Sequence, residues 1–257
     1  MILKDIIDII ESAAPLSYQE SWDNSGMQVG NTGTDITAAL LTTDITEPVV
    51  SEAIDKGCNL IISHHPLLFH PLKHICGLTP QERCVALAIR HGIAIYSSHT
   101  AMDSVLHGVS GRMADILGVT DYRILVPSSE NGDYGLGVIG SLPSPMSYAA
   151  FLHLVKERFG ATYVRYTAPK TDSVQCIAMC GGAGAEFAEE AIRQGADVYL
   201  TADCKYHDMQ AAAGRIALVD IDHWVSEHFT RNIFQQLLQN KVKTYISEAD
   251  QTPVHIL

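Results

Sequence analysis

Short, continuously apolar runs that alternate with helical patterns constrain the fold of this chain more than any other feature. The run at 59–63 (Asn-Leu-Ile-Ile-Ser) shows no polar alternation, and similar runs occur at 38–43, 92–97, 197–201 and 216–221. Strands of this kind belong to parallel sheets whose two faces are covered by helices. Helical patterns separate them at 47–56, 80–91, 185–194 and 206–213. The sequence therefore predicts the α/β class.

The remaining patterns extend this order through the whole chain. Apolar residues such as Ile6, Ile7 and Ile10, separated by charged ones, indicate an amphipathic helix at the N-terminus. Further helices are expected at 108–117, 147–159 and 224–240, and further strands at 135–141, 162–167, 173–180 and 243–247. The Gly/Pro/Ser-rich stretch 126–135 is typical of a connection.

An internal similarity suggests two related parts. Residues 53–65 align without a gap with residues 191–203, and each segment holds a helix end, a glycine and a strand that finishes in polar side chains. Any helix-glycine-strand unit has this form, so duplication and convergence both stay open. We predict two linked α/β lobes with mainly parallel sheets, formed by residues 1–125 with 224–257 and by residues 126–223.

The charge balance excludes a broad class of partners. The 257 residues include 17 Lys and Arg against 29 Asp and Glu, which gives a formal charge of −12 with neutral histidines. Nucleic-acid-binding proteins use a basic surface to displace counterions, so we expect no nucleic-acid partner. With 47% hydrophobic and 18% charged residues, the composition is that of a globular protein and not of a disordered one.

Cysteine spacing and the lack of long apolar segments predict a cytoplasmic protein. The six cysteines are scattered and form no CxxC pair, which we interpret as reduced, buried thiols. No segment approaches the roughly 20 apolar residues of a membrane span, and charges interrupt the N-terminal helix where a signal peptide would be apolar. We therefore expect no membrane partner.

Side chains that bind metals follow three of the predicted strands. His64 and His65 come directly after the apolar residues 60–62. Because Pro66 restricts His65 to an extended conformation where the strand ends, both rings can address one pocket. Taken alone, an adjacent histidine pair is also expected by chance in a chain of this composition.

The other two strands end in the same types of residue. His99 and Asp103 follow strand 92–97, and alone they would be a loop histidine and a helix N-cap. His223 and Glu227 follow strand 216–221, and their spacing of four residues puts them on one face of a helix. Such a spacing also arises by chance, so each pair is a weak signal by itself.

We expect the three strand ends to converge on the same edge of a parallel sheet, the edge where open α/β sheets bind ligands. Together they predict a metal site between the lobes. Of their four histidines, three are taken as ligands (His64, His65 and His223), together with the two carboxylates. A single catalytic zinc takes three ligands from protein, whereas a bridging carboxylate lets five serve two ions. No sulfur is needed, which favours Zn, Fe or Mn. We expect two divalent metal ions per subunit.

These motifs make the chain similar to the GTP cyclohydrolase 1 type 2 homologue family, also described as dinuclear-metal-centre hexameric proteins. The matching segments run in family order from about residue 20 to 230, at 23–30, 63–69, 96–103, 197–201 and 223–227. The resemblance implies two linked α/β lobes and a homohexameric ring. It also implies a two-metal site with the ligands His64, His65, Asp103, His223 and Glu227.

Two stretches depart from the family pattern. The family often has Thr-Gly-Glu where this chain has Thr-Ala-Asp at 201–203, and Gly-His-Tyr where it has Asp-His-Trp at 222–224. The replacements at Asp203, Asp222 and Trp224 alter the shape and charge of the pocket. These replacements therefore bear on the identity of the substrate more than on the binding of the metal.

The predicted function is metal-dependent hydrolysis. A hydroxide held between two divalent ions is a nucleophile at neutral pH and could attack a nucleotide or a phosphoester, with GTP suggested by the family label. His99 is the candidate acid or base, or else a partner of a metal ligand. His207 could reach the same pocket or be a solvated residue at a helix start. The alternative is a metal-stabilised hexameric scaffold or regulatory protein without catalysis.

Other motifs near the predicted site have mainly structural interpretations. The backbone amides of residues 180–184 (Cys-Gly-Gly-Ala-Gly) could meet an anion, but these glycines are more typical of a tight turn. Asp23, Asn24 and Gly26 are interpreted as a hydrogen-bonded turn near the site. Phe69 and Trp224 are interpreted as packing residues and not as stacking platforms. A small anionic or nucleotide substrate remains possible, because two ions would attract it locally despite the charge of −12.

Overall fold

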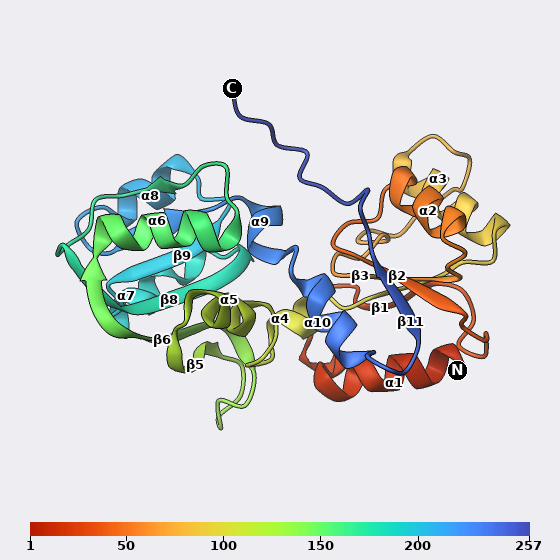
Figure 1. The fold of residues 1–257 in the computed structure, drawn as a ribbon, viewed down its shortest axis with the longest axis horizontal. Coiled ribbons are helices and arrows are strands. Elements are labelled where there is room, and N and C mark those ends of the chain that lie inside the picture. The colour runs from red at the N-terminus through yellow and green to blue at the C-terminus, as the bar shows by residue number, and fades with distance from the viewer. The chain divides into compact units, whose positions relative to one another are not determined.

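Two separate sheets organise the chain, which a computed structural model describes over residues 1–257 (Figure 1). Unit 1 comprises Met1–Met102 and His228–Gln251, and unit 2 comprises Asp103–Glu227 and Thr252–Leu257. Each unit contains one sheet with helices, so the predicted α/β class is confirmed. The first boundary lies at 102/103 instead of 125, because β5 (Thr120–Pro127) pairs with β6 (Gly135–Ser147) in the sheet of unit 2. The second lies at 227/228 instead of 223/224.

The sheet of unit 1 has five strands in the order β1-β4-β3-β2-β11. These are β1 (Gly26–Val29), β2 (Ala38–Thr42), β3 (Leu60–Ser63), β4 (Ala94–Ser97) and β11 (Lys243–Ile246). All neighbours are parallel except β1, which is antiparallel to β4. Thr42, Ser63 and Ser97 are level in the register, so the chain leaves β2, β3 and β4 at one edge of the sheet.

Helices cover both faces of this sheet (Figure 1). Side chains of Leu40, Ile61 and Ile95 pack in one core with α2 (Glu47–Asp55) and α3 (Pro80–Arg90). Both helices begin with a threonine cap and a proline in the first turn, as expected for helix N-termini. The opposite face packs with α10 (Thr230–Leu237), which contacts α1 (Leu3–Ala13).

The sheet of unit 2 has six strands in the order β5-β6-β8-β9-β10-β7. The remaining strands are β7 (Arg165–Tyr166), β8 (Ser173–Ala183), β9 (Val198–Ala202) and β10 (Ala217–Asp220). Only β8, β9 and β10 pair in parallel, and the other three pairings are antiparallel. The mainly parallel pairing predicted for both lobes therefore describes unit 1, whereas the second sheet is mixed.

Helices also cover both faces of the second sheet. Helices α5 (Val109–Leu117) and α6 (Tyr148–Phe159) contact β6 and β8 on one side. The short helices α7 (Ala188–Arg193) and α8 (Tyr206–Ala212) share a core with β8, β9 and β10 on the other (Figure 1). The helix predicted at 224–240 is divided into α9 (His223–Glu227) and α10, and the boundary between the units falls between them.

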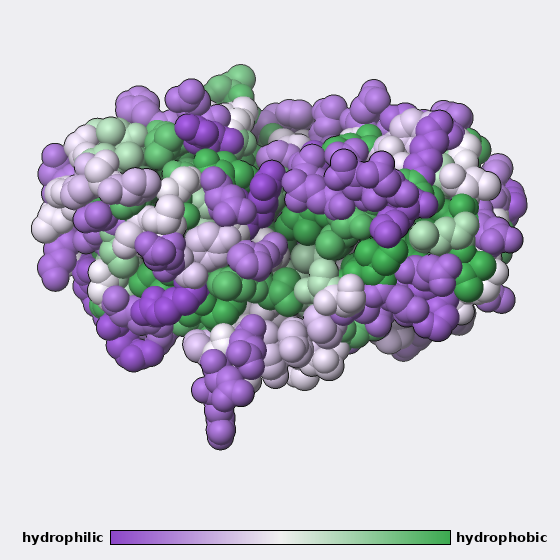
Figure 2. Space-filling model, turned by 60° about the horizontal axis from the view of Figure 1, so that its bottom comes forward, coloured by the Kyte–Doolittle hydropathy of each residue, from purple (hydrophilic) through white to green (hydrophobic).

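Hydrophilic residues cover most of the face seen in Figure 2, and apolar residues appear there in separate patches. None of the helices combines the length and the apolar character that a membrane crossing requires. All six cysteines are free thiols. Four are buried and Cys176 is partly buried, but Cys76 is exposed, so the prediction of buried thiols is wrong for Cys76.

Candidate metal centre

In unit 1, two of the predicted ligands lie at the common edge where β2, β3 and β4 end. His64 and His65 follow β3 directly, and their backbone nitrogens donate to the carbonyls of Thr42 and Thr43 at 3.2 and 2.9 Å. The Ser63 hydroxyl donates to the carbonyl of His65 at 2.8 Å. These bonds extend the β2–β3 pairing past the end of the strand and so fix the backbone of both histidines.

Three histidine rings gather at this edge. The ring centroids of His64 and His65 are 4.9 Å apart. The centroid of the His99 ring lies 5.3 Å from that of His64 and 5.4 Å from that of His65. One donor atom from each of the three rings lies within 4.8 Å of the others. Three imidazole nitrogens at this spacing can hold a divalent ion. His99, predicted as an acid, a base or a partner of a ligand, is therefore also a candidate ligand.

Each of these rings points its Nδ1 at an oxygen acceptor. The partners are the Ser98 carbonyl for His64 at 3.1 Å, Asp44 for His65 at 2.8 Å and Asp23 for His99 at 2.8 Å. Carbonyl and carboxylate oxygens only accept hydrogen bonds, so Nδ1 carries the proton and Nε2 of a neutral ring keeps its lone pair. Metal-binding histidines are held in this way by a second oxygen partner.

Asp23 ties the 21–26 segment to the end of β4. Besides His99, its carboxylate accepts from the hydroxyls of Ser25 and Thr100 at 2.8 and 2.6 Å and from the backbone nitrogen of Thr100 at 3.0 Å. Burial alone would raise the pKa of Asp23, but these hydrogen bonds and the charge of His99 hold that pKa well below its usual value. Asp23 is thus ionised, and it does more than form the turn that the sequence indicated.

In unit 2, the parallel strands β9 and β10 end side by side, and each is followed by a residue of the candidate site. Thr201 pairs with Asp220, so Asp203 and His223 leave the sheet at the same edge. His223 Nδ1 lies 2.8 Å from Asp203 Oδ2, and its Nε2 lies 3.0 Å from Glu227 Oε2. His223 and Glu227 lie on α9 at the predicted spacing of one helical turn.

The two carboxylates around His223 favour a positive charge at this position. Burial would lower the pKa of His223, but the hydrogen bonds and charges of Asp203 and Glu227 raise it to about 11. The two carboxylates thus stabilise the proton on His223, and they would stabilise the positive charge of a divalent cation for the same reason. Imidazole with carboxylate is also a donor set typical of Zn, Fe and Mn, so the residues of unit 2 fit the predicted metal.

The third predicted ligand of unit 2, Asp103, stands at the end of α4 (Thr100–Asp103) and is the first residue of this unit. Glu227 is the last residue of the same stretch. Burial raises the pKa of the Cys180 thiol, and the charges of Asp103 and Glu227 raise it further. Both carboxylates therefore act on one buried cysteine, which is kept as an unreactive thiol.

The backbone around His223 is held in an uncommon conformation. Asp203 and Asp222 have φ values of 54° and 78°, in the left-handed region that few residues other than glycine adopt. Asp220 fixes both turns, because its carboxylate accepts from the backbone nitrogens of Cys204 and Asp222 at 2.9 and 3.2 Å and from Arg165. Two of the positions that depart from the family pattern thus shape the turns beside the site.

The glycines of residues 180–184 allow α9 to approach β8. The nitrogens of Gly181 and Gly182 donate to the hydroxyls of Ser110 and Ser226 at 3.3 and 2.9 Å. The nitrogen of Gly184 donates to the Thr201 hydroxyl at 3.1 Å. These amides already have partners, so an anion cradle is not supported. The segment is a bulged end of β8, since the pairing with β9 shifts between Met179 and Ala183.

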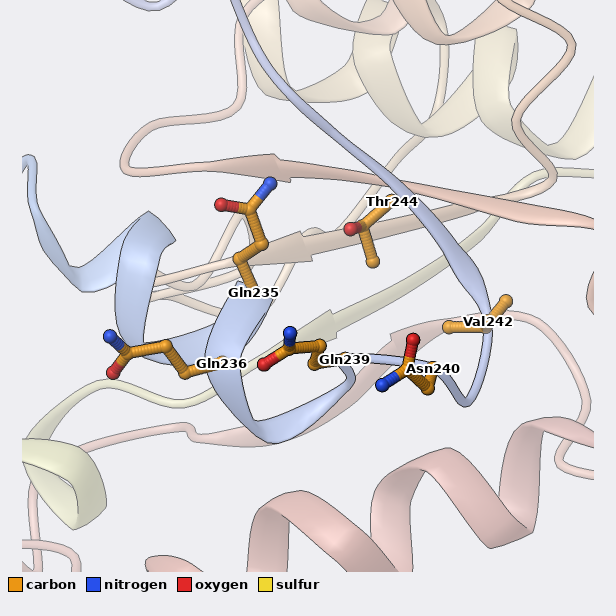
Figure 3. A pocket seen from close by; sticks show the side chains of 6 residues that line it. All are labelled: Gln235, Gln236, Gln239, Asn240, Val242 and Thr244. Atoms are coloured by element: carbon orange, nitrogen blue, oxygen red, sulfur yellow. The ribbon is translucent and has the colours of Figure 1, made fainter.

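Other candidate residues and pockets lie outside the site. His207 is exposed on α8 and its Nδ1 lies 3.2 Å from Gln210 Oε1, which agrees with the solvated helix-start interpretation. In unit 1 a pocket of about 350 Å³ is bordered by α10 and β11 (Figure 3). Amide, hydroxyl and apolar side chains line it, from Gln235, Gln236, Gln239, Asn240, Val242 and Thr244. It contains no titratable group and offers no metal ligand.

The predicted gathering of three strand ends at one sheet is wrong in one respect. Strands β3 and β4 belong to the sheet of unit 1, whereas β10 belongs to that of unit 2. The sequence analysis did not identify Asp44, and it placed Asp23 and Asp203 near the site without recognising that they orient histidines. Asp44 and Asp203 follow the ends of β2 and β9, so their positions carried a signal, whereas Asp23 lies in a turn far along the chain from His99.

Comparison with known proteins identifies relatives over most of the chain. Residues 1–253 match the family model Duf34/NIF3 (NGG1p interacting factor 3). A Clostridium perfringens protein named GTP cyclohydrolase 1 type 2 homolog is 35% identical over 228 residues, which cover 88% of this chain and 87% of that protein. A Lactococcus lactis protein of the same name is 33% identical over 263 residues and 99% of both chains. The predicted resemblance is confirmed.

Solved structures share the fold. A Bacillus cereus protein related to NIF3 superposes with a TM-score of 0.89 at 24% identity, over 100% of this chain and 99% of that one. The Staphylococcus aureus protein SA1388 superposes with a TM-score of 0.90 at 25% identity, over the same shares of the two chains. These likenesses support the α/β architecture of two sheets.

Proposed function

The chain belongs to the Duf34/NIF3 family, and from this premise we propose that it is a hydrolase dependent on two divalent metal ions per subunit. The proposed ligands are His64 and His65 of unit 1 and Asp103, His223 and Glu227 of unit 2. Zn, Fe or Mn suits this set of nitrogen and oxygen donors. Clustered histidine and carboxylate groups that could bind a metal ion are present in the chain.

One observation carries this proposal: all four histidines of the two groups direct Nδ1 to an oxygen that can only accept. In unit 1 the acceptors are a carbonyl and two carboxylates, and in unit 2 the acceptor of His223 is Asp203. The acceptor fixes the proton on Nδ1 of each ring, and Nε2 is the atom that a metal would bind; in His223 this atom faces Glu227 Oε2 at 3.0 Å. Exposed His207 makes a similar contact with Gln210, but it stands alone, whereas these four histidines lie in groups with other metal-binding side chains.

The substrate class proposed is a nucleotide or another phosphoester. The relatives carry the name GTP cyclohydrolase 1 type 2 homolog, which points to a nucleotide. A divalent ion bound here supplies Lewis acidity, which polarises an electrophile and lowers the pKa of water. His99 is placed to accept or donate a proton, and the hydrogen bond with Asp23 fixes its tautomer. We further propose a homohexamer without nucleic-acid or membrane partners.

Metal analysis of matched variants tests the ligand set. The purified protein should hold two ions per subunit by elemental analysis, whereas His64→Ala and Glu227→Ala should each lower that content. His91→Ala, an exposed histidine at the end of α3, should leave it unchanged. Wild-type metal content in the His64 and Glu227 variants would contradict the assignment. Light scattering gives the oligomeric state of the same samples.

Turnover is tested separately on the metal-loaded protein. A panel of nucleotides and phosphomonoesters should include at least one substrate whose hydrolysis stops when a chelator removes the metal. His99→Ala should lower turnover more than metal content. If a fully loaded protein turns over none of the panel, the metal would serve a scaffold or regulatory protein instead.

A further inference from the structure

Two exposed aromatic side chains stand beside the three histidines of unit 1. Trp22 is 58% exposed and Phe69 is 39% exposed, and their ring centroids are 5.9 Å apart. Each ring also contacts His99 edge to face, at 5.9 Å from Trp22 and 6.2 Å from Phe69. Phe69, interpreted from the sequence as a packing residue, thus contacts neighbouring rings and also keeps part of its surface exposed beside the histidines.

The loops that carry the two rings are tied together. The Asn24 side chain donates to the carbonyl of Leu68 at 2.6 Å, and the nitrogen of Leu68 donates to Gln28 Oε1 at 3.1 Å. The Gln28 amide in turn donates to the carbonyl of Asn24 at 2.7 Å. Trp22 is two residues from Asn24 and Phe69 is next to Leu68, so both rings are held on a closed set of hydrogen bonds. Such preorganised rings lose little entropy when they bind a ligand.

The open aromatic surface is too small for a protein interface. Aromatic side chains of this kind offer about 150–250 Å² each, so the exposed parts of the two come to roughly 200 Å². A stable interface buries about 800 Å² on each partner. Of the residues beside the rings in the chain, Ser21, Asp23 and His70 are polar, and the apolar Leu68 is only partly exposed, so the patch gains little area from them. One planar ring matches this area.

We propose that Trp22 and Phe69 form a stacking platform for the planar heteroaromatic ring of the substrate, with a purine base as the ligand class. Because the two rings are inclined at 54°, the base stacks on the face of one ring and meets the other at an angle. Tryptophan and phenylalanine rings stack on the faces of nucleic-acid bases, and this contact does not depend on the hydrogen-bonding groups of the base. The exposed fractions of Trp22 and Phe69 show that part of their surface is open for such a contact. The inference rests on the proposed hydrolase function, to which it adds a substrate with an aromatic ring.

Calorimetric titration with two probes tests the platform. Metal-loaded protein is titrated with guanosine 5′-monophosphate and with ribose 5-phosphate, which lacks the base. The first should bind at least about tenfold more tightly, which corresponds to about 1.4 kcal/mol. Trp22→Leu and Phe69→Leu should each weaken the binding of guanosine 5′-monophosphate about tenfold and leave ribose 5-phosphate unchanged, whereas Trp22→Phe should retain most of the affinity.

The matched control is Tyr166→Leu. Tyr166 is 57% exposed and makes an edge-to-face contact with Tyr148 but with no histidine, so its replacement should not change either affinity. Equal affinity for the two probes, no binding of guanosine 5′-monophosphate at millimolar concentration, or an unchanged affinity in Trp22→Leu would overturn the platform. A change in oligomeric state with unchanged affinity would do the same.

The metal content of every sample separates this inference from the proposed function. If the wild-type protein binds two ions and hydrolyses a phosphoester but shows no preference for the base, the platform fails and the hydrolase stands. If the protein retains no metal, the hydrolase proposal fails whatever the stacking result.

Discussion

Replacing Gly182 by alanine tests whether Glu227 is a metal ligand from its present position. Gly182 has φ +63°, and a Cβ built on it would lie 2.3 Å from Glu227 Oε1 and 3.4 Å from His223 Cε1. The carboxylate oxygen would have to withdraw by about 1 Å to reach ordinary van der Waals contact. Ligand distances in metal sites hold within about 0.2 Å, so a displacement of this size removes Glu227 from the coordination of an ion.

Gly160→Ala is the matched control, because Gly160 has the same φ of +63° and nothing within 4 Å of the added carbon. An alanine in this left-handed conformation costs about 1–2 kcal/mol of stability in either variant. Only Gly182→Ala should also lose metal affinity. The expected loss is at least about tenfold, the lower end of what is seen when a residue that merely supports a ligand is changed.

The assay needs two measurements on each variant. Urea unfolding of the chelator-treated protein gives the free energy of unfolding, and competition with a fluorescent chelator gives the Zn²⁺ dissociation constant. Both variants should lose similar stability, while Gly160→Ala keeps the wild-type dissociation constant. Wild-type affinity in Gly182→Ala would refute the role of Glu227. An equal affinity loss in both variants would show that general destabilisation, and not ligand displacement, is responsible.

Three further predictions concern orientation, pH and packing. Asp44→Ala removes the carboxylate at His65 Nδ1 and should weaken metal binding about 10–100-fold in the same competition assay. Burial alone would raise the pKa of Glu52. Hydrogen bonds from the backbone of residues 248 and 249 and from the side chains of Lys56 and Ser247 outweigh this effect and lower the pKa from 4.5 to about 2. Glu52→Gln should thus cost about 1–3 kcal/mol at pH 7, and urea unfolding should show this gap shrinking as the pH falls from 4.5 toward 2; a constant gap would contradict the reasoning. Ile61→Ala, in a fully buried strand, should lower the free energy of unfolding by about 2–5 kcal/mol. A loss below about 1 kcal/mol would mean that this core is loosely packed.

Continuous apolar runs predicted the central strands well. Strands β2, β3 and β9 agree with the predicted ranges within about two residues, because their residues are buried on both faces. Two other strands gave no such signal. β1 is a half-buried edge strand that begins with glycine, and β5 contains Asp121 and Arg123 and ends in a proline. Their pairing partners, β4 and β6, supply what the local sequence lacks.

The break between α9 and α10 was also invisible to periodicity. Apolar residues continue at helical spacing through 224–240, so the pattern predicts one helix. The chain passes from unit 2 to unit 1 at 227/228, and the two halves of the pattern therefore face different cores. A periodic pattern reports that a face is buried, but not against which sheet.

The candidate site shows which features of a possible metal-binding group a sequence can reveal. Their position after a strand end predicts that His64 and His65 can reach a ligand at the edge of the sheet. A pair of histidines that occurs there by chance would give the same prediction. What separates the two cases is the acceptor at each Nδ1, and for His99 that acceptor is Asp23, 76 residues away in the chain. No periodicity or spacing relates residues so far apart, because only the packing of the 21–26 turn against the end of β4 joins them. The orienting oxygens are thus the stronger evidence for metal binding, and they become visible only once the chain is folded.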